Sequence, residues 1–304
     1  MLKYVYLTSS GYSGSTLLAF MMGAHPKIAT VGELGAAPEV GSPDNYRCSC
    51  GNLLKNCAFW SQVSIRLQTL HKDFSYRNFG TALAPRGNTF LHRLQFGNLR
   101  SNRISDIRDY IFNRIPKCYN HANWIVKRNI DLASSILEVT NKDIFFDTSK
   151  NPAKINLLKE NLECDLKVIH LIKDGRGVFD SIKKYYPERP DYKAIVAWKK
   201  VNRFAERALQ YVEKEHRYQL LYKDLATNPE YELKKLCNFI GVDYSPQCLD
   251  FRQSNHHILG NTKMRLGSNS SIYYDEKWRR SLSSEQLKLF DRLAGKMNRK
   301  YGYF

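Results

Sequence analysis

The protein has 304 residues, of which 43% are hydrophobic and 12% are aromatic. This composition excludes an intrinsically disordered chain, and the length suffices for one large α/β domain or two small ones with a sizeable core. The formal net charge is +18, from 47 basic and 29 acidic residues, so we expect an anionic ligand or partner.

The chain shows no sign of membrane insertion or secretion. No apolar run approaches the roughly 18 residues that a membrane span requires. The N-terminal segment 1–7 is too short for a signal peptide and runs directly into a loop motif. Seven cysteines, an odd number, are scattered along the sequence, which does not indicate a secreted disulfide framework. We therefore predict a cytoplasmic protein without an integral membrane segment.

Apolar, β-rich segments alternate with amphipathic segments along the chain. A strand is predicted over 3–8, a helix over 16–24 and a second short strand over 28–31. Later strands are predicted over 143–149, 166–172 and 218–225, and later helices over 151–162, from about 178, and over 191–215, 228–242 and 283–299. This alternation predicts an α/β fold with a central parallel sheet flanked by helices on both faces.

Two segments between these elements lack the same rhythm. Residues 38–60 are rich in Gly, Pro, Ser, Asn and Cys and are predicted to form a loop. Residues 61–120 are helical in parts, and eight Arg or Lys against two Asp lie between 88 and 128. We expect one domain over residues 1–304, in which 61–128 form a helical insertion that faces the substrate.

The loop after the first strand, "SGYSGST" at 10–16, has the composition of a phosphate-binding turn. A tight Gly/Ser turn before a helix offers backbone N–H groups and the positive end of the helix dipole to an anion. A nucleotide-binding P-loop would carry lysine directly after Gly14, where this chain has Ser15. On this evidence alone, an ordinary turn between a strand and a helix explains the pattern equally well.

The stretch "SGSTLLAFMMGAHPKIATVGEL" resembles the start of sulfotransferases that use 3′-phosphoadenosine 5′-phosphosulfate (PAPS). In that family a loop of the type [RK]-S-G-[ST]-[ST]-L wraps the 5′-phosphosulfate. The resemblance implies that this group is bound by Gly11, Tyr12, Ser13, Gly14, Ser15 and Thr16. The sequence departs from the family pattern at Tyr12, because members carry there a basic residue that helps to neutralise the sulfuryl group and the leaving phosphate.

A second motif, "VIHLIKDGRGVFDSIKK" at 168–184, resembles the family's strand, R-D-P-R-[DG] turn and helix. The resemblance implies that Lys173 and Ser181 bind the 3′-phosphate of the cofactor, with Arg176 nearby. Lysine keeps the charge of the usual arginine but loses its bidentate geometry, and Gly175 replaces the usual proline. A cation at the end of a strand and a hydroxyl in the next helix can share one phosphate.

Further matches extend the resemblance over most of the chain. "FDTSKNP" at 146–152 and "YKDLATNPEYELKKLCNFIGV" at 222–242 resemble segments of bacterial and protein-tyrosine sulfotransferases, and some resemblance to carbohydrate sulfotransferases is present. "GNTKMRLG…DEKWRRSLS" at 260–283 resembles the loop that closes over the adenosine 3′-phosphate, which implies cofactor contacts for Arg265 and Gly267 and a match for Trp278. Together these matches imply a P-loop NTPase-like sulfotransferase fold.

Sulfuryl transfer needs a cation at the leaving oxygen, a base for the acceptor proton and tight positioning. Lys150 is the candidate cation, because the lysine of this segment reaches the leaving oxygen in related enzymes; the alternative is a surface lysine. Glu33 is the candidate base, or else it only positions substrate. His170 lies within a strand and is predicted to be a core histidine. His256 and His257 face either the acceptor or solvent.

The segment "CSCGNLLKNCAFW" places Cys48, Cys50 and Cys57 close together. A zinc site usually has four ligands with C-x₂₋₄-C spacing, so C-x-C with one further cysteine and no adjacent histidine is a poor match. Related bacterial sulfotransferases carry a similar segment. We interpret it as a structural loop or a redox-sensitive pair and predict no metal site.

The predicted activity is sulfuryl transfer from PAPS, with adenosine 3′,5′-bisphosphate as the product. The predicted acceptor is a hydroxyl, or as a second choice an amine, of a small molecule or carbohydrate, without a nucleic-acid partner. A P-loop nucleotide or sugar kinase is the alternative, but it would require the missing Walker lysine. A nucleic-acid or membrane-surface binder would explain the charge of +18, but it predicts dispersed basic and aromatic motifs.

Overall fold

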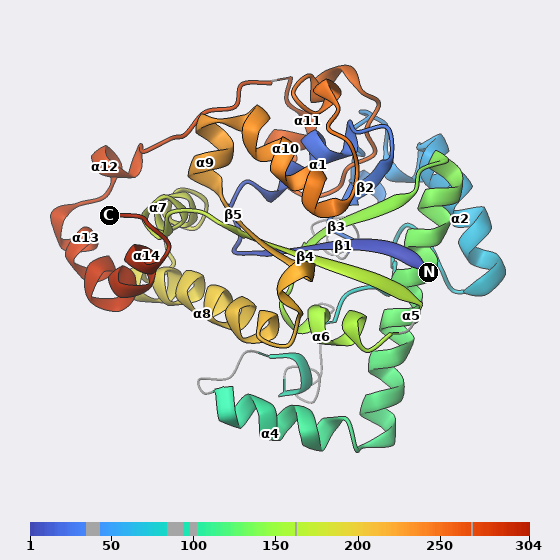
Figure 1. The fold of residues 1–304 in the computed structure, drawn as a ribbon, viewed down its shortest axis with the longest axis horizontal. Coiled ribbons are helices and arrows are strands. Elements are labelled where there is room, and N and C mark those ends of the chain that lie inside the picture. Colours follow the sequence, from blue (N-terminus) through green and yellow to red (C-terminus); the bar gives the residue numbers. More distant parts are fainter. Residues whose placement is uncertain (35–42, 84–93, 98–101, 162, 269) are drawn as a thin grey trace.

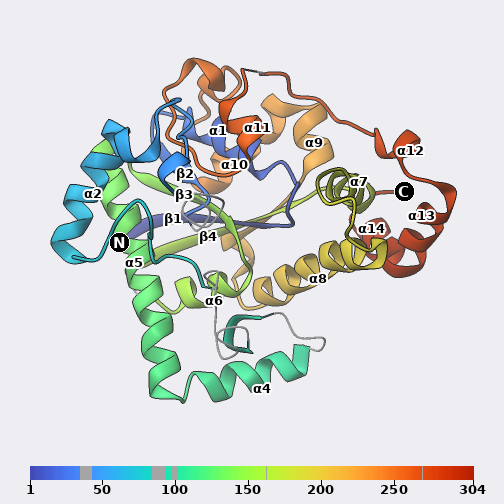
Figure 2. The same cartoon turned by 180° about the vertical axis from the view of Figure 1, so that it is seen from behind.

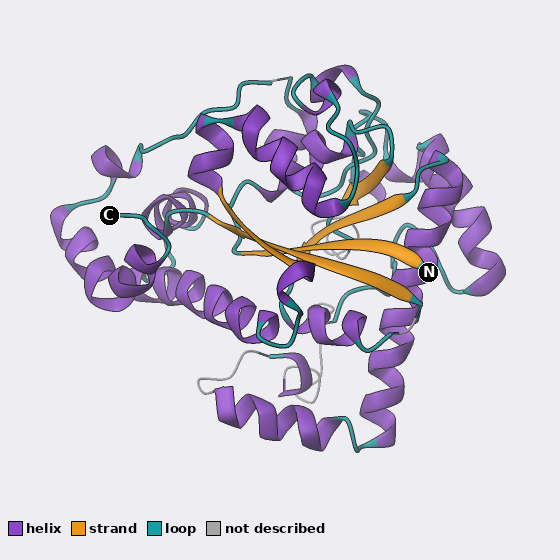
Figure 3. Cartoon of the chain, viewed as in Figure 1, coloured by secondary structure: helices purple, strands orange, loops and turns teal. Residues whose placement is uncertain are grey.

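The computed structural model describes residues 1–34, 43–83, 94–97, 102–161, 163–268 and 270–304. Its centre is a sheet of five strands: β1 (Leu2–Ser9), β2 (Ile28–Gly32), β3 (Ile144–Lys150), β4 (Cys164–Ile172) and β5 (Arg217–Leu221). The strand order is β2-β3-β1-β4-β5, and every neighbouring pair is parallel. Helices cover both faces of this sheet (Figures 1 and 3), so the predicted α/β class is confirmed.

The helices form two layers that the views from front and back show consistently (Figures 1 and 2). One layer contains α1 (Ser15–Gly23), α9 (Tyr222–Thr227), α10 (Pro229–Ile240) and α11 (Thr262–Leu266). The other contains α5 (Pro116–Thr140), α6 (Ala153–Lys159) and α8 (Asp191–Leu209). Because side chains alternate along a strand, Val5 and Leu7 of β1 pack in the first layer's core, whereas Tyr4 and Tyr6 pack in the second.

The remaining helices surround this three-layer centre. They are α2 (Ala58–Leu70), α4 (Asn102–Phe112), α7 (Gly175–Tyr185), α12 (Trp278–Ser281), α13 (Ser284–Phe290) and α14 (Lys296–Lys300), with a π-helical turn over Asp291–Gly295. Short 3₁₀ turns span Pro43–Asn45, Leu54–Asn56, Lys214–His216, Pro246–Cys248 and Phe251–Gln253. A third core cluster packs α7 and α8 against the C-terminal helices. Among the described helices, none has the length and apolar character to cross a membrane.

Several predicted boundaries were wrong: the helices predicted over 191–215 and 151–162 span Asp191–Leu209 and Ala153–Lys159, and two further differences bear on the site. The strand predicted over 218–225 ends at Leu221, and Tyr222 begins α9, which turns Leu225 into the core with no exposed surface. Helix α7 begins at Gly175 instead of near residue 178, because the Asp174 carboxylate accepts the Arg176 N–H at 2.9 Å and caps the helix. Both differences place these residues close to the sheet edge.

The described part of the range 61–128 contains most of α2, all of α4 and the first half of α5. Residues 84–93 and 98–101 lie outside the described residues. Some of its basic side chains form ion pairs within the molecule. Arg128 is fully buried and donates to Asp73 at 2.8 Å and to the Phe79 carbonyl. Arg108 pairs with Asp109 at 2.7 Å. The proposed role of this range as a substrate-facing insertion stays a prediction.

A buried ion pair supports the end of β3. The Lys154 Nζ of α6 lies 2.7 Å from Asp147 Oδ2, and the two side chains are 3% and 0% exposed. Tyr4 donates its hydroxyl proton to the same carboxylate at 2.7 Å, and the Ser149 N–H donates to Oδ1 at 2.8 Å. Burial lowers the pKa of Lys154, while the Asp147 charge opposes this shift. The carboxylate therefore joins β1, β3 and α6 directly below Lys150.

We predict that Lys154→Ala lowers the free energy of unfolding by about 3–5 kcal/mol, because it leaves Asp147 buried without a counter-ion. Lys127→Ala is the control, since it removes a half-exposed lysine that pairs with Asp131 one helical turn away. That change should cost about 1 kcal/mol or less. Urea unfolding followed by circular dichroism measures both values. Equal, small losses in the two variants would contradict the supporting role of the buried pair.

Candidate functional site

All five strands end at one edge of the sheet, because parallel strands share their direction, and each end carries a candidate group. These groups are Glu33 after β2, Lys150 at the end of β3, the loop 10–14 after β1, Lys173 after β4 and Tyr222 after β5. The sequence indicated the first four. It did not indicate Tyr222, which was predicted to lie inside a strand.

The strand order explains why the two cofactor motifs lie next to each other. β1 pairs with β4 from Leu2↔Cys164 to Ser9↔Leu171. The chain leaves β1 towards β2 on one side of the sheet and leaves β4 towards β5 on the other side. Open α/β sheets bind ligands in the crevice at such a switch point, outside the carboxyl ends of the strands. The loop 10–14 and the turn that begins at Lys173 flank this switch point, and we call the region between them the crevice.

The loop 10–14 presents the N-terminus of α1 to the crevice. Gly14 is the N-cap residue of α1 with φ 93°, no side chain caps the helix, and its first turn contains no acidic residue. Ser13 is buried and donates its hydroxyl proton to Ser9 Oγ at 2.9 Å, so it supports the loop from inside. The first backbone N–H groups of a helix have no partner within the helix, and they favour an anionic ligand.

Tyr222 connects this loop to Lys173. A Cβ atom on Gly14 would lie 2.3 Å from the Tyr222 ring, so both the positive φ and the close contact require glycine. The Lys173 ammonium lies 4.9 Å from the centre of the same ring, within cation–π range. Burial raises the pKa of the Tyr222 hydroxyl, with smaller effects from nearby acidic groups, so it remains a hydrogen-bond donor at neutral pH.

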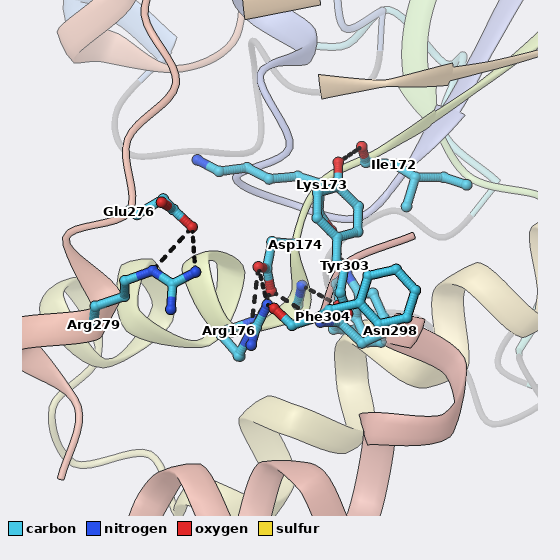
Figure 4. A network of polar contacts seen from close by, with 11 residues as sticks. Ile172, Lys173, Asp174, Arg176, Glu276, Arg279, Asn298, Tyr303 and Phe304 are labelled. Atoms are coloured by element: carbon cyan, nitrogen blue, oxygen red, sulfur yellow. Dashed lines mark hydrogen bonds and ion pairs between the residues drawn. The ribbon is translucent and has the colours of Figure 1, made fainter. Parts of the chain in front are cut away.

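The Lys173 ammonium is mostly buried and, in the described part of the chain, has no carboxylate within salt-bridge distance. Burial lowers its pKa, although three aspartates further away oppose the shift. Figure 4 shows the contrast with its neighbours: Arg176 is paired with Asp174 at 2.7 Å and Arg279 with Glu276 at 2.8 Å, whereas no dashed line joins Lys173 to the residues drawn. A buried cation of this kind favours an anionic ligand.

Arg176 fastens the C-terminal segment to the turn after β4 and is not a free cation. Its guanidinium donates to Asp174 and to the main-chain oxygen of Phe304 at 2.9 Å, and lies 4.0 Å from the centre of the Trp278 ring. Asn298 accepts the Gly175 N–H at 2.8 Å and donates to Asp174 (Figure 4). These contacts make the turn rigid where it supports Lys173.

Two further polar side chains lie near Lys173: Ser181, which belongs to α7, and Trp278, which begins α12. A Cβ atom on Gly177 would lie 3.5 Å both from Lys173 Cε and from Trp278 Cδ1, so the two side chains adjoin the same helical turn. The Ser181 hydroxyl donates to the Gly177 carbonyl at 2.8 Å and must rotate to donate to a phosphate. The buried Trp278 Nε1–H has no hydrogen-bond partner within the described ranges.

Tyr12, which stands at the family's basic position, spans the crevice. Its ring stacks on Tyr185 at the end of α7, with centroids 5.3 Å apart and planes 11° from parallel. Burial raises the pKa of Tyr12 to about 12, with smaller effects from Tyr186 and Tyr185. The hydroxyl is therefore neutral at physiological pH and supplies no charge. Its ring instead packs the loop after β1 against the helix that follows β4.

Lys150 and Glu33, the two candidate catalytic residues, form an ion pair. Lys150 Nζ lies 2.5 Å from Glu33 Oε1, and the side chains are 19% and 21% exposed. A Cβ atom on Gly260 would lie 3.2 Å from Glu33 Oε1 and 3.4 Å from Thr16 Oγ1. The pair therefore lies beside the first turn of α1, next to the N–H groups of the phosphate loop.

Backbone strain coincides with the same two places. Among the described residues other than glycine, three have positive φ: Tyr12 (60°), Asn141 (51°) and Lys150 (71°). Asn141 ends α5, where a left-handed residue is ordinary. The other two lie in the phosphate loop and at the candidate catalytic lysine. Such strained conformations cluster at functional sites, where the surrounding structure maintains them.

Arg265 and Gly267 lie away from Lys173. The Arg265 guanidinium is 4.0 Å from the centre of the Tyr46 ring and donates to the Gly260 carbonyl at 3.3 Å. The structure therefore groups Arg265 with Glu33. A Cβ atom on Gly267 would lie 2.5 Å from the Lys263 carbonyl oxygen, so the tight end of α11 by itself requires glycine there.

The three histidines separate into different environments. His170 is 2% exposed, its Nε2 lies 3.0 Å from Asn202 Oδ1, and burial lowers its pKa to about 4, as befits the predicted core histidine. His256 is also buried, and burial lowers its pKa to about 4. His257 contacts cysteine sulfurs instead of a substrate crevice.

Comparisons with known proteins agree with this architecture. Residues 5–246 match the sulfotransferase family. The fold is similar to the sulfotransferase domain of the olefin synthase from Synechococcus PCC 7002, with a TM-score of 0.55, 18% identity and coverage of 97% of this chain and 94% of that chain. It is also similar to the sulfotransferase domain from the curacin biosynthetic pathway, with a TM-score of 0.54, 17% identity and 98% coverage of both chains.

A search of curated protein sequences found no match. The family match nevertheless extends over most of the chain and includes the ends of all five strands, where the candidate groups lie. The parallel sheet and its flanking helices have the same fold as the two sulfotransferase domains. On this evidence, the chain belongs to the sulfotransferase family.

Proposed function

We propose that the protein transfers a sulfuryl group from PAPS to a hydroxyl of a small-molecule or carbohydrate acceptor by in-line displacement. Membership of the family supports sulfuryl transfer to an acceptor. The choice of PAPS rests chiefly on one observation: Lys173, mostly buried and without a counter-ion among the described residues, contacts the same Tyr222 ring as the uncapped N-terminus of α1. Two separate anion sites suit a ligand that carries two anionic groups.

The two sites fit the two ends of the proposed ligand. We assign the 5′-phosphosulfate to the loop from Gly11 to Thr16, whose N–H groups point out of α1. We assign the 3′-phosphate to Lys173 and Ser181, with the Trp278 indole N–H as a further donor. Arg265 packs beside Gly260 and Glu33, which favours a role near the reacting end.

Lys150 and Glu33 are the proposed catalytic pair. PAPS supplies the sulfuryl group, and negative charge develops on the oxygen that leaves with the phosphate, so a nearby ammonium stabilises the transition state. Lys150 supplies that charge in place of the basic residue that Tyr12 replaces. Glu33 positions the ammonium at 2.5 Å, and it becomes available to accept the acceptor proton when Lys150 engages the leaving oxygen.

Binding of adenosine 3′,5′-bisphosphate tests the proposed cofactor. We expect it to raise the melting temperature, and Lys173→Ala to weaken its binding about 10- to 100-fold, because one charge-assisted phosphate contact is lost. Titration calorimetry gives the affinities, and Lys184→Ala, which changes an exposed lysine of α7, is the control. Adenosine 5′-monophosphate, which lacks the 3′-phosphate, should bind the wild type and Lys173→Ala with equal affinity. Absence of binding, or equal affinity for Lys173→Ala, would contradict the assignment.

The affinity for the same nucleotide should depend on pH in a way that Lys173→Arg abolishes. Burial lowers the pKa of Lys173, so its ammonium loses the proton at a lower pH than an exposed lysine does. The protonated form binds phosphate, and affinity therefore falls as the pH rises through the lowered pKa. Arginine stays charged up to about pH 12, so the variant should keep its affinity between about pH 7 and pH 10. Parallel pH profiles of the wild type and the variant would argue against Lys173 as the phosphate cation.

Lys150→Met should lower kcat about 10²- to 10³-fold, because a preorganised charge at the leaving group is lost. The affinity for adenosine 3′,5′-bisphosphate should fall by a smaller factor than kcat, because Lys150 interacts most strongly with the charge that develops on the leaving oxygen in the transition state. Turnover is measured with sulfur-labelled PAPS and an acceptor selected from a panel of phenols, alcohols and sugars. Lys159→Ala, a partly exposed lysine of α6, is the control. Near-normal turnover in Lys150→Met would refute the catalytic role.

A further inference from the structure

Three cysteines and one histidine gather outside the crevice. Cys48, Cys50, Cys57 and His257 each offer one ligand atom, and these four atoms all lie within 4.8 Å of one another. Cys48 and His257 are separated by 209 positions in the sequence. The cysteines lie in the segment before α2, whereas the histidine lies in the segment that leads to Gly260. The cluster therefore joins two distant parts of the chain.

We propose that this cluster binds one Zn²⁺ as a closed, structural Cys₃His site. His257 Nδ1 lies 3.5 Å from Cys48 Sγ and 3.4 Å from Cys57 Sγ, and Cys50 Sγ lies 3.7 Å from Cys57 Sγ. Tetrahedral zinc, with bonds of about 2.3 Å to sulfur and about 2.0 Å to nitrogen, requires S···S separations near 3.7 Å and S···N separations near 3.5 Å. These three separations match that coordination shell, and all four ligand atoms lie within 4.8 Å of one another.

The donor set and its surroundings suit the same ion. Thiolate sulfur and imidazole nitrogen in a four-donor set select zinc among the common divalent metals. Cys48 and Cys57 are buried, at 0% and 1% exposure, so a bound cation compensates thiolates that would be costly to bury alone. Cys57 is also the N-cap residue of α2, where the helix dipole favours a thiolate. Four protein ligands leave no open position, which indicates a structural site.

Neighbouring contacts hold the two segments in the same arrangement. Ser49 lies between the cysteines, donates its hydroxyl proton to the His256 carbonyl at 2.7 Å and accepts the Ile258 N–H at 2.8 Å. The Phe59 ring stacks on the His257 imidazole, with centroids 4.3 Å apart and planes 6° from parallel. These contacts orient the imidazole and keep the cysteine segment close, as the supporting shell of a metal site does.

The bound ion would stabilise one wall of the candidate active site. Beyond His257, the Leu259 N–H donates to the Val31 carbonyl at 2.7 Å and extends the edge of the sheet beside β2. The next residue, Gly260, is the one that touches Glu33. Zinc at the cluster would therefore fix the segment that packs against Glu33, three positions after its own histidine ligand.

A disulfide between Cys50 and Cys57 is the competing explanation. It would require the two sulfurs to approach to about 2.05 Å and would remove two of the four ligands. It would also leave the placement of Cys48 and His257 unexplained. Cys237 and Cys248 provide an internal comparison, because they are also buried and hydrogen-bonded to each other. Among the described residues, however, they do not belong to a group of side chains that could hold a metal ion.

Metal analysis of the full-length protein, purified in reductant and without chelator, tests the proposal. We expect one zinc ion per chain by mass spectrometry, and release of that zinc when a mercurial reagent titrates the thiols, a readout that needs no variant. Cys57→Ser and His257→Ala should lose zinc by roughly tenfold or more. His257→Cys should retain it, because a fourth thiolate can replace the imidazole, and Cys237→Ser is the control.

Cobalt(II) provides a second, independent readout. The chelator-treated protein should take up Co²⁺ and show the intense visible bands and thiolate charge-transfer absorption of a tetrahedral site. Protein that carries no zinc and takes up neither metal would overturn the proposal. It would also be overturned if Cys57→Ser and His257→Ala kept the zinc of the wild type, or if the reduced protein released no zinc to the mercurial reagent. None of these measurements depends on sulfuryl transfer.

Discussion

The parallel pairing of β1 with β4 determines where the chemistry of this protein is located. It brings the end of the first strand next to a segment that follows more than half of the chain later, and the opposite directions in which the chain leaves the two strands open a crevice between them. Tyr222 connects its two sides, with its ring against Gly14 and within cation–π distance of the Lys173 ammonium.

Electrostatics explain how the site tolerates a tyrosine at the family's basic position. Tyr12 is neutral and packs on Tyr185, so positive potential must come from elsewhere. The uncapped end of α1 supplies a partial charge and Lys173 a full one, and in the proposed mechanism Lys150 adds another when it leaves Glu33. Lys150 adopts a positive φ at the end of a strand that the buried Asp147 carboxylate joins to β1 and α6. The strained lysine therefore follows a well-anchored segment of β3.

The sequence predicted what depends on local patterns. Apolar runs identified all five strands, although β5 was drawn too long, because "YKDL" has the composition of a strand but turns into α9. The sequence also predicted features that depend on a single segment, such as the glycine turn at Gly14 and the cation after β4. The role of Tyr222, the ion pair of Lys150 with Glu33 and the approach of His257 to the cysteines arise from tertiary packing between distant segments. No local pattern contains that information.

The most direct test of this account is the crystal structure of the protein with adenosine 3′,5′-bisphosphate bound. The account predicts that the 5′-phosphate lies on the N–H groups at the start of α1 and that the 3′-phosphate lies against the Lys173 ammonium and the Ser181 hydroxyl, on the two sides of the crevice between β1 and β4. A nucleotide bound elsewhere, or one whose 3′-phosphate makes no contact with Lys173, would contradict it.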